Sequence, residues 1–309
     1  SLNANIGYWA SMPLNITDFT RNSKDSSSYW KGQLFGLPIG MVGLALVGSL
    51  VTSSTVEIYG EPIWDPIILT SRMDSPILVI GMMAFLMLAT LTTNVAANGY
   101  SPSMDIAHIS NGRLSFKQSA FLLGIISILI QPWKLLNDLS LYMNLFLNGC
   151  SVFLAPIAGI LICQYTLLNR RTLNVDSLYS QDGEYNYSKL SDLNKKVSIM
   201  HFILAVVLIL LSLIGSSDWV MQITKIGVSI KLLLYALTAY LVIVGLFLYY
   251  HKDGGVNPLA LGTLSISVLI CYMGLWFSNL VALYDGSYFI GLLISLIIYY
   301  FSMKKYALR

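Results

Sequence analysis

Charged residues are scarce in this chain of 309 residues: only 11% are Asp, Glu, Lys or Arg, whereas a soluble domain has about 25%. Apolar residues make up 56% of the chain, and the mean hydropathy is +0.69. This composition excludes an ordinary soluble domain and predicts an all-α protein that crosses a lipid bilayer several times. The net charge of +3 is small and does not suggest a nucleic-acid partner.

Cysteine and histidine are also rare, with three of each in the chain. The cysteines are far apart within apolar segments, so they predict neither a disulfide framework nor a metal site. They are Cys150, Cys163 and Cys271. We interpret the histidines as ordinary side chains near the membrane surfaces rather than metal ligands. They are His108, His201 and His251.

Motifs for catalysis are missing as well. The sequence has no Gly-rich phosphate loop, no Ser-His-Asp set and no HExxH motif. A membrane hydrolase needs a nucleophile with a base, or metal ligands, at membrane depth. Apart from tyrosines, the apolar spans contain little beyond Asp18 and Lys231 that could titrate. We therefore expect neither an enzyme nor a cofactor.

Nine apolar segments are long enough, or nearly so, to cross a bilayer. The first begins at the start of the chain, which opens with serine, so we expect a truncated chain with an incomplete first segment. The predicted segments are 2–19, 33–52, 76–98, 117–131, 139–168, 198–215, 226–250, 258–281 and 287–303.

The basic residues agree with this topology. If the connection after the first segment is cytoplasmic, the inside loops are 20–32, 99–118, 169–197, 251–257 and the C-terminus. Of the 18 Lys and Arg residues, 14 then lie inside and three outside, with Lys231 left in a span. This is the positive-inside bias. It predicts a multi-pass protein of the plasma membrane with a cytoplasmic C-terminus.

The most informative polar stretch, residues 91–102, follows the long apolar run 75–91. Polar side chains at membrane depth are costly and usually face a bundle interior, a pathway or a ligand. Asn94 and Asn98 are four residues apart and share a helix face, and Thr92 and Thr93 precede them by one turn, beside Ala89. We expect this face to offer oxygens to a small cation and an amide to a solute.

The first segment carries signals for an interrupted helix. Gly7-Tyr8-Trp9 is followed by Met12-Pro13, and a broken membrane helix frees backbone groups to bind solutes. Trp9 would stack on a planar ring, or else serve as an interfacial anchor. Asp18 and Arg21 are three apart and predict an ion pair on one helix face, either as a local cap or in gating.

Two further amides, Asn144 and Asn148, repeat the spacing of four residues in the fifth span. We prefer the interpretation that they hold helices together over direct contact with a substrate. The fourth span ends at Gln131-Pro132-Trp133.

Several motifs together resemble the nucleobase–cation symporter family 1, which includes hydantoin, allantoin, uracil and cytosine permeases. The resemblance runs to about Tyr187 and resumes at Gly255. The motifs are 7–9 (GYW), 15–21 (NITDFTR), 32–38 (GQLFGLP), 93–98 (TNVAAN), 131–133 (QPW), 155–159 (APIAG), 176–180 (DSLYS) and 183–185 (GEY).

The resemblance implies a LeuT-type inverted-repeat fold in which this chain has the second five-helix repeat and the C-terminal helices, while the first repeat is missing. The implied parts are the repeat at 1–168, a cytoplasmic loop at 169–196, a two-helix insertion at 197–254, and two last helices with a tail at 255–309.

The resemblance also assigns roles to single residues. Trp9 matches a stacking tryptophan, and Asn98, with Asn94 nearby, matches an amide that binds the heterocycle. The Ala89 carbonyl, Thr92 and Thr93 match Na⁺ ligands. Gly7 lies at the helix break, and Pro132-Trp133 precedes a helix that gates in relatives.

Two functions follow from these expectations. One is a secondary transporter that imports a small planar heterocycle, such as uracil or allantoin, with Na⁺ or H⁺ by alternating access. Its partners would be the solute, the bilayer and the missing N-terminal half of the same transporter. The alternative is a truncated, non-transporting half or subunit of such a permease.

Overall fold

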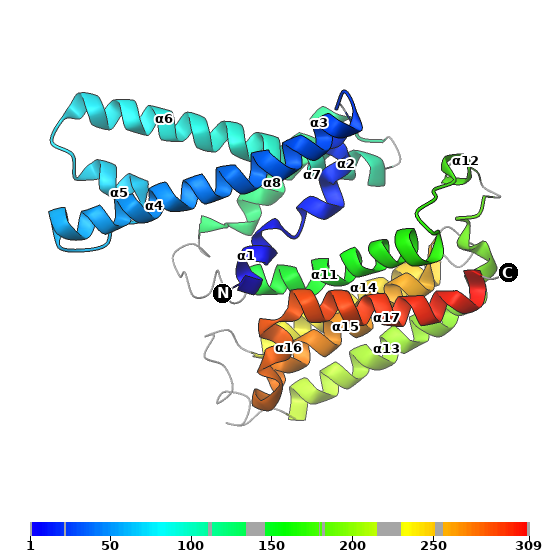
Figure 1. The fold of residues 1–309 in the computed structure, drawn as a ribbon. Coiled ribbons are helices and arrows are strands. Elements are labelled where there is room, and N and C mark those ends of the chain that lie inside the picture. The colour runs from blue at the N-terminus through cyan, green and yellow to red at the C-terminus, as the bar shows by residue number, and fades with distance from the viewer. Residues whose placement is uncertain are drawn as a thin grey trace. The chain divides into compact units, whose positions relative to one another are not determined.

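The computed structural model is built from α-helices (Figure 1). It describes residues 2–21, 23–110, 113–133, 146–178, 180, 183–214, 230–250 and 256–307. Within these ranges the regular elements are all helical, which confirms the all-α prediction, and six helices are long and apolar enough to cross a membrane. Two shorter apolar helices, Phe116–Ile130 and Leu234–Tyr250, coincide with further predicted spans.

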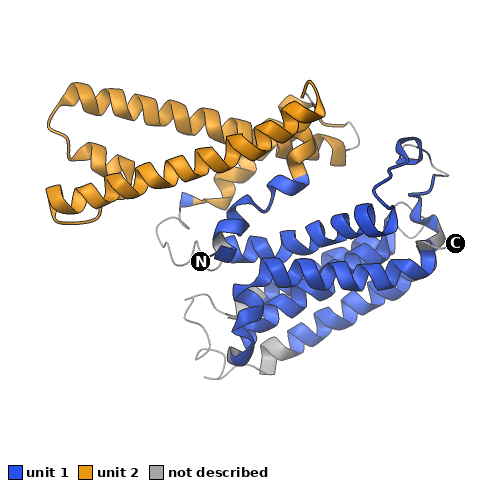
Figure 2. Ribbon diagram, in the orientation of Figure 1, with its two compact units in different colours: residues 1–14, 133–309 blue, residues 15–132 orange. Residues whose placement is uncertain are grey.

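The chain divides into two compact units (Figure 2). Unit 1 contains residues 1–14 and 133–309, and unit 2 contains residues 15–132. The predicted division at residues 168, 196 and 254, and the inverted repeat, stay predictions.

The first long helix of unit 2 starts earlier than the sequence suggested. Helix α3 (Ser26–Lys31), the π-helical turn η1 (Gly32–Gly36) and α4 (Leu37–Tyr59) follow one another without a break over 34 residues. Asp25 caps the start, because its carboxylate accepts the backbone N–H of Ser28 at 2.6 Å. This bond holds the pKa of Asp25 below its ordinary value.

The second long helix corrects a predicted loop. Helix α6 (Pro76–Asn94), the π-helical turn η2 (Val95–Gly99) and α7 (Tyr100–Ile109) form another continuous stretch of 34 residues. The prediction that 99–118 is all loop is therefore wrong for 100–109. The Tyr100 N–H donates to the Val95 carbonyl, five residues back. This wider turn lets the helix continue past Gly99 and Pro102, residue types that usually interrupt a helix.

The rest of unit 2 is helical too. Helix α5 (Pro66–Ser71) precedes α6, and α8 (Phe116–Ile130) begins with a capping box between Ser115 and Gln118. Gln131 ends α8 in the left-handed region, with φ of 53°. The predicted end of this span at Gln131-Pro132-Trp133 is therefore confirmed.

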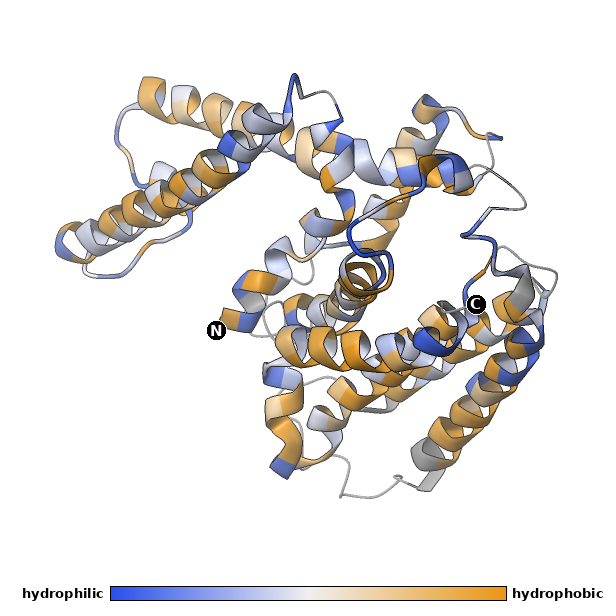
Figure 3. Ribbon diagram, turned by 45° about the vertical axis from the view of Figure 1, so that its right-hand side comes forward, coloured by the Kyte–Doolittle hydropathy of each residue, from blue (hydrophilic) through white to orange (hydrophobic). Residues whose placement is uncertain are grey.

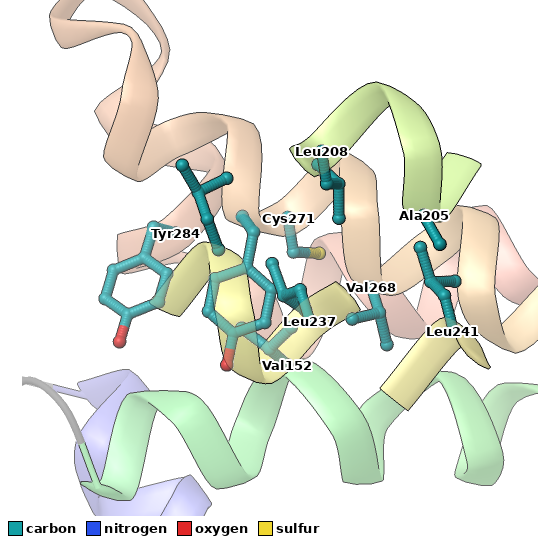
Figure 4. Close-up of a cluster of buried hydrophobic side chains, with 10 residues drawn as sticks. Val152, Ala205, Leu208, Leu237, Leu241, Val268, Cys271 and Tyr284 are labelled. Carbon is teal, nitrogen blue, oxygen red and sulfur yellow. The ribbon is translucent and has the colours of Figure 1, made fainter. Parts of the chain in front are cut away.

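Unit 1 holds a packed core of helices. Helix α11 (Asn148–Ile162) continues into the π-helical turn η4 (Cys163–Leu168) and packs along α17 (Ser287–Ala307), while α13 (Ser191–Ile214) packs along α14 (Ile230–Tyr250). Helix α15 (Pro258–Trp276) contacts all four, and α16 (Val281–Asp285) packs beside it. Figure 4 shows side chains from these helices meeting, among them Val152, Leu241, Val268 and Tyr284.

Short elements connect the long ones. Helix α1 (Leu2–Trp9) lies in unit 1, and the boundary between the units falls inside α2 (Met12–Thr20). Helix α12 (Val175–Leu178) and the 3₁₀ turn η5 (Tyr187–Leu190) lie between η4 and α13, and the 3₁₀ turn η6 (Ser278–Leu280) precedes α16. Figure 3 shows apolar residues along the long helices and hydrophilic residues gathered in connections and at helix ends, as a bilayer requires.

Candidate functional site

The polar face that the sequence predicted lies at the end of α6 and in η2. We call Thr92, Thr93, Asn94 and Asn98 the polar face. All four side chains are exposed in this chain. The Nδ2 of Asn98 donates to the Oδ1 of Asn94 at 2.7 Å, so the two amides do share one side of the helix. Asn94 thereby fixes the orientation of the Asn98 amide.

The hydroxyl of Thr92 is turned toward its own helix. It donates to the carbonyl oxygen of Leu88 at 2.8 Å and to that of Ala89 at 3.1 Å. Because the proton is used in this way, the Thr92 oxygen has only lone pairs left to offer outward. The Ala89 carbonyl, which was predicted to bind the cation, already accepts this hydroxyl, and the Ala89 residue is half-buried.

Asn94 is the last residue of α6, and Asn98 lies within the π-helical turn η2. Such turns are uncommon and occur frequently at functional sites. Sequence reasoning missed the turn, because glycine and proline, here Gly99 and Pro102, usually end a helix. The turn therefore widens the helix beside the amides of Asn94 and Asn98.

An open depression of about 460 Å³ lies beside the polar face. Its lining comes from α5 and α6 and is mostly apolar, with Asn94 contributing an amide. The lining residues are Pro66, Ile67, Met83, Leu86, Met87, Thr90, Leu91 and Asn94. An apolar wall with few polar groups is typical of small-molecule sites.

The predicted break in the first segment is confirmed. Helix α1 ends at Trp9, a turn follows at Ala10 and Ser11, and α2 begins at Met12. Trp9 is half-buried, and its ring contacts that of Tyr8 with the centroids 5.3 Å apart. Trp9 belongs to unit 1 whereas Asn98 belongs to unit 2. Their joint action on one solute therefore stays a prediction.

Gly7 allows α1 to approach the start of α11 closely. A Cβ at this position would lie 2.5 Å from the carbonyl oxygen of Leu147 and 2.5 Å from the Oγ of Ser151. Both distances are far below ordinary van der Waals contact. Glycine is therefore required here for packing, in addition to its predicted place next to the helix break.

Asn148 is buried and acts between helices. Its Oδ1 accepts from the Nδ2 of Asn3 at 2.8 Å, and Asn3 also donates to Ser287 Oγ at 3.3 Å. The Tyr288 N–H donates to Asn3 Oδ1 at 3.0 Å. These bonds join α1, α11 and α17, which supports helix cohesion rather than substrate contact for Asn148. Sequence reasoning missed Asn3, although an amide so early in an apolar run was a signal.

The other predicted positions have different outcomes. Asn144 lies outside the described residues. Pro132 and Trp133 follow the end of α8, and Trp133 is 51% exposed. Their gating role stays a prediction.

The predicted ion pair between Asp18 and Arg21 is wrong. Asp18 accepts from the hydroxyl of Ser101, and Arg21 donates to the hydroxyl of Tyr100. Arg21 follows the last residue of α2, and each of the two side chains has a hydroxyl partner on α7 in place of the other charge. Both side chains contact α7 instead.

In the part of the chain that the structure describes, no three His, Cys, Asp or Glu side chains gather to hold a metal ion. A cation at the polar face would depend on neutral oxygens from hydroxyl, amide and carbonyl groups, which are ligands for hard cations.

Comparison with known proteins identifies the family. Residues 1–245 match the family described as permeases for cytosine/purines, uracil, thiamine and allantoin. The chain is 38% identical to an allantoin permease of Bacillus subtilis over 185 residues, which are 60% of this chain and 37% of the relative. It is 37% identical to a purine-uracil permease of Arabidopsis thaliana over 209 residues, 67% of this chain and 35% of the relative.

A putative allantoin permease of Escherichia coli is 30% identical over 187 residues, which are 60% of this chain and 38% of that protein. The chain thus spans somewhat more than a third of the length of these curated relatives. No solved structure matches the chain. The family match, the apolar helices and the motifs agree, and the chain belongs to the permease family for cytosine/purines, uracil, thiamine and allantoin.

Proposed function

We propose that this chain is part of a secondary active transporter that imports a planar nucleobase, hydantoin or ureide together with a cation by alternating access. The observation that carries the proposal is the polar face at the end of α6, beside an apolar depression, in a chain whose relatives are named as allantoin, purine and uracil permeases. Transport requires no covalent chemistry, in keeping with the lack of catalytic motifs.

The Asn98 amide suits the edge of such a solute. One of its N–H groups is used by Asn94, which leaves the Asn98 carbonyl oxygen and the second N–H. A ureide or imide edge presents an N–H next to a C=O, so it would pair with Asn98 through two parallel hydrogen bonds. Trp9 would stack on the face of the same ring.

The coupling ion would bind at Thr92, Thr93 and the Ala89 carbonyl. Thr92 already presents its lone pairs, and Na⁺ would replace the Thr92 hydroxyl proton as the partner of the Ala89 oxygen. Two adjacent hydroxyls without a carboxylate favour Na⁺ over H⁺ as the coupling ion.

The remaining parts of the site would come from the first repeat. The polar face is exposed in this chain, and the matched residues cover only 37% of the length of the Bacillus subtilis allantoin permease. A first repeat would cover this face, complete the cation site and supply the second stacking surface. The assembled transporter would lie in the plasma membrane with the C-terminus in the cytoplasm and Pro132-Trp133 at a gate.

Uptake of radiolabelled allantoin and uracil tests the proposal. Asn98→Ala in the assembled transporter removes two hydrogen bonds of about 1 kcal/mol each, so we expect the half-saturating solute concentration to rise by about 30-fold at unchanged expression. Thr92→Ala should weaken the dependence on Na⁺. Ser127→Ala is the matched control, since this exposed hydroxyl of α8 also donates to its own helix, at 2.8 Å. Unchanged uptake with Asn98→Ala would refute the substrate site.

A second candidate is a non-transporting half or a subunit of such a permease. Cells that express these 309 residues alone, or together with a first repeat, distinguish the two. Uptake with the 309 residues alone supports transport by this chain. Uptake only on co-expression supports the subunit. No uptake in either case would overturn the proposal.

A further inference from the structure

A chain of polar side chains crosses three helices in the core of unit 1. His201 of α13 is fully buried, and its Nδ1 lies 2.7 Å from the carbonyl oxygen of Val197. Its Nε2 lies 2.8 Å from the Oγ of Ser265, on α15. The hydroxyl of Tyr240, on α14, lies 3.2 Å from the same Ser265 oxygen. We call His201, Ser265 and Tyr240 the histidine relay.

The contacts of the relay fix which atoms carry protons. A carbonyl oxygen only accepts hydrogen bonds, so the His201 nitrogen that faces Val197 must carry a hydrogen. In the neutral imidazole the other nitrogen, Nε2, is then an acceptor, and it receives the Ser265 hydroxyl. The Ser265 oxygen in turn accepts from Tyr240. The donors therefore run from Tyr240 through Ser265 to His201.

The helices that carry the relay have few charged side chains in the described part of the chain. Helices α14 and α15 contain no Asp or Glu, and the only basic residue in them is Lys231, whose side chain the structure does not describe. On α13, Asp192, Lys195 and Lys196 lie near its start, and the two lysines are exposed.

The other titratable side chains on the packed helices are a thiol and phenols rather than carboxylates. They are Cys271 and Tyr272, buried on α15, and Tyr235, Tyr249 and Tyr250, exposed on α14. A charge on His201 would therefore have no counter-ion among the described residues that face it.

Close packing leaves little room for rearrangement around the imidazole. A Cβ built on Gly245 of α14 would lie 3.3 Å from the Cβ of His201. The hydroxyl of Ser198, three residues before His201, donates to the carbonyl oxygen of Gly245 at 2.8 Å. The hydroxyl hydrogens of Ser265 and Tyr240, by contrast, can rotate without moving a heavy atom.

We propose that His201 is a proton-binding site, and that the histidine relay reverses its hydrogen bonds when the proton binds. The proton adds to the Nε2 lone pair, and the new Nε2–H donates to the Ser265 oxygen. The Ser265 hydrogen rotates toward the Tyr240 oxygen, and the Tyr240 hydrogen turns away. One proton is gained and no bond between heavy atoms changes.

Proton binding at this site acts on the packing of the helices. It places a positive charge among apolar side chains without a carboxylate to balance it, which is costly. Acidification therefore weakens the association of α13 and α14 with α15. This behaviour does not depend on transport and concerns unit 1 alone.

Nitrogen NMR of the full chain, ¹⁵N-labelled at histidine and held in lipid nanodiscs, tests the site. The chain has three histidines, so H108Q and H251Q assign the signals. At pH 9 we expect His201 to carry a hydrogen on Nδ1 only, and on acidification to pH 5 its Nε2 signal should move to the protonated position. Ser265→Ala should shift the midpoint by at least half a pH unit. A His201 signal that is constant from pH 5 to 9, or a midpoint unaffected by Ser265→Ala, would overturn the proposal.

Thermal unfolding provides a second readout. The unfolding temperature of the unaltered chain should fall on acidification by several degrees more than that of H201Q, which cannot take up the proton. Tyr240→Phe keeps the ring that packs against Phe153, with the centroids 5.4 Å apart, and removes only the last hydroxyl. Tyr240→Phe should change the fall in unfolding temperature on acidification. This test remains available even if the H201Q chain does not fold. H108Q is the matched control and should respond like the unaltered chain. Identical acid responses in Tyr240→Phe and the unaltered chain would contradict the relay.

Discussion

Replacing Gly159 by alanine should push α11 and α17 apart. Gly159 is buried at the place where these two helices are closest, and a Cβ there would overlap the Ser295 hydroxyl and lie 2.5 Å from the Leu292 carbonyl oxygen. Ordinary contact begins at 3.4 Å, so the helices must separate locally by about 0.9 Å. Small residues at such crossings allow the backbones of membrane helices to approach.

The magnitude follows from two opposing effects. Overpacking a close interface costs about 1–3 kcal/mol, and alanine regains up to about 1 kcal/mol through its higher helix propensity. We therefore expect Gly159→Ala to lower the free energy of unfolding by about 1–2 kcal/mol. The measurement is the loss of helical circular dichroism in detergent micelles titrated with sodium dodecyl sulfate.

Two further variants make this test specific. Gly43→Ala in α4 is the control, because a Cβ there would have nothing within 4 Å, so it should be neutral or slightly stabilising. Adding Ser295→Ala to Gly159→Ala removes one of the overlapping atoms and should recover part of the loss. Equal stability of the Gly43→Ala and Gly159→Ala chains would refute the packing argument.

Three other changes have defined outcomes. Asn148→Leu removes the acceptor of buried Asn3 and should cost about 1 kcal/mol of unfolding free energy in the same titration. Ser115→Ala breaks the capping box of α8 and should lower the free energy of unfolding by about 1 kcal/mol, or raise amide exchange in the first turn of α8. Equal amide exchange in the altered and unaltered chains would contradict this. The pKa of Asp25 is lowered by its bond to the Ser28 N–H. Its stabilisation is therefore complete above the ordinary pKa and is lost as the pH falls through the lower folded value. Exchange of the Ser28 amide should rise only in that acid range, and a rise near neutral pH would rule this out.

Long apolar runs made much of the fold predictable. The predicted spans at 76–98, 258–281 and 287–303 coincide with α6, α15 and α17, because a bilayer leaves the backbone little choice except a helix. The helix past Gly99 was missed, since glycine and proline usually end a helix and only the wider η2 turn allows it to continue.

The site was predictable to a lesser extent. The pairing of Asn94 with Asn98 followed from a spacing of four residues, which is local. The pairing of Asn148 with Asn3 spans 145 positions and depends on how the helices pack, so no spacing rule could supply it. His201 was expected near a membrane surface, and its burial where α13 packs against α14 and α15 depends on helix packing that its place in the sequence does not reveal.

The unbroken helix from Pro76 to Ile109 determines the depth of the polar face. At a rise of 1.5 Å per residue, Thr92 lies about 24 Å and Asn98 about 33 Å from Pro76 along the axis. The hydrocarbon layer is about 30 Å thick, and membrane helices tilt by at most about 40°. With Pro76 at one boundary, even that tilt leaves both side chains beyond the midplane, at depths of about 18 and 25 Å. A solute held there is close to water on one side of the membrane, and the route to the other side must pass most of the apolar length of α6.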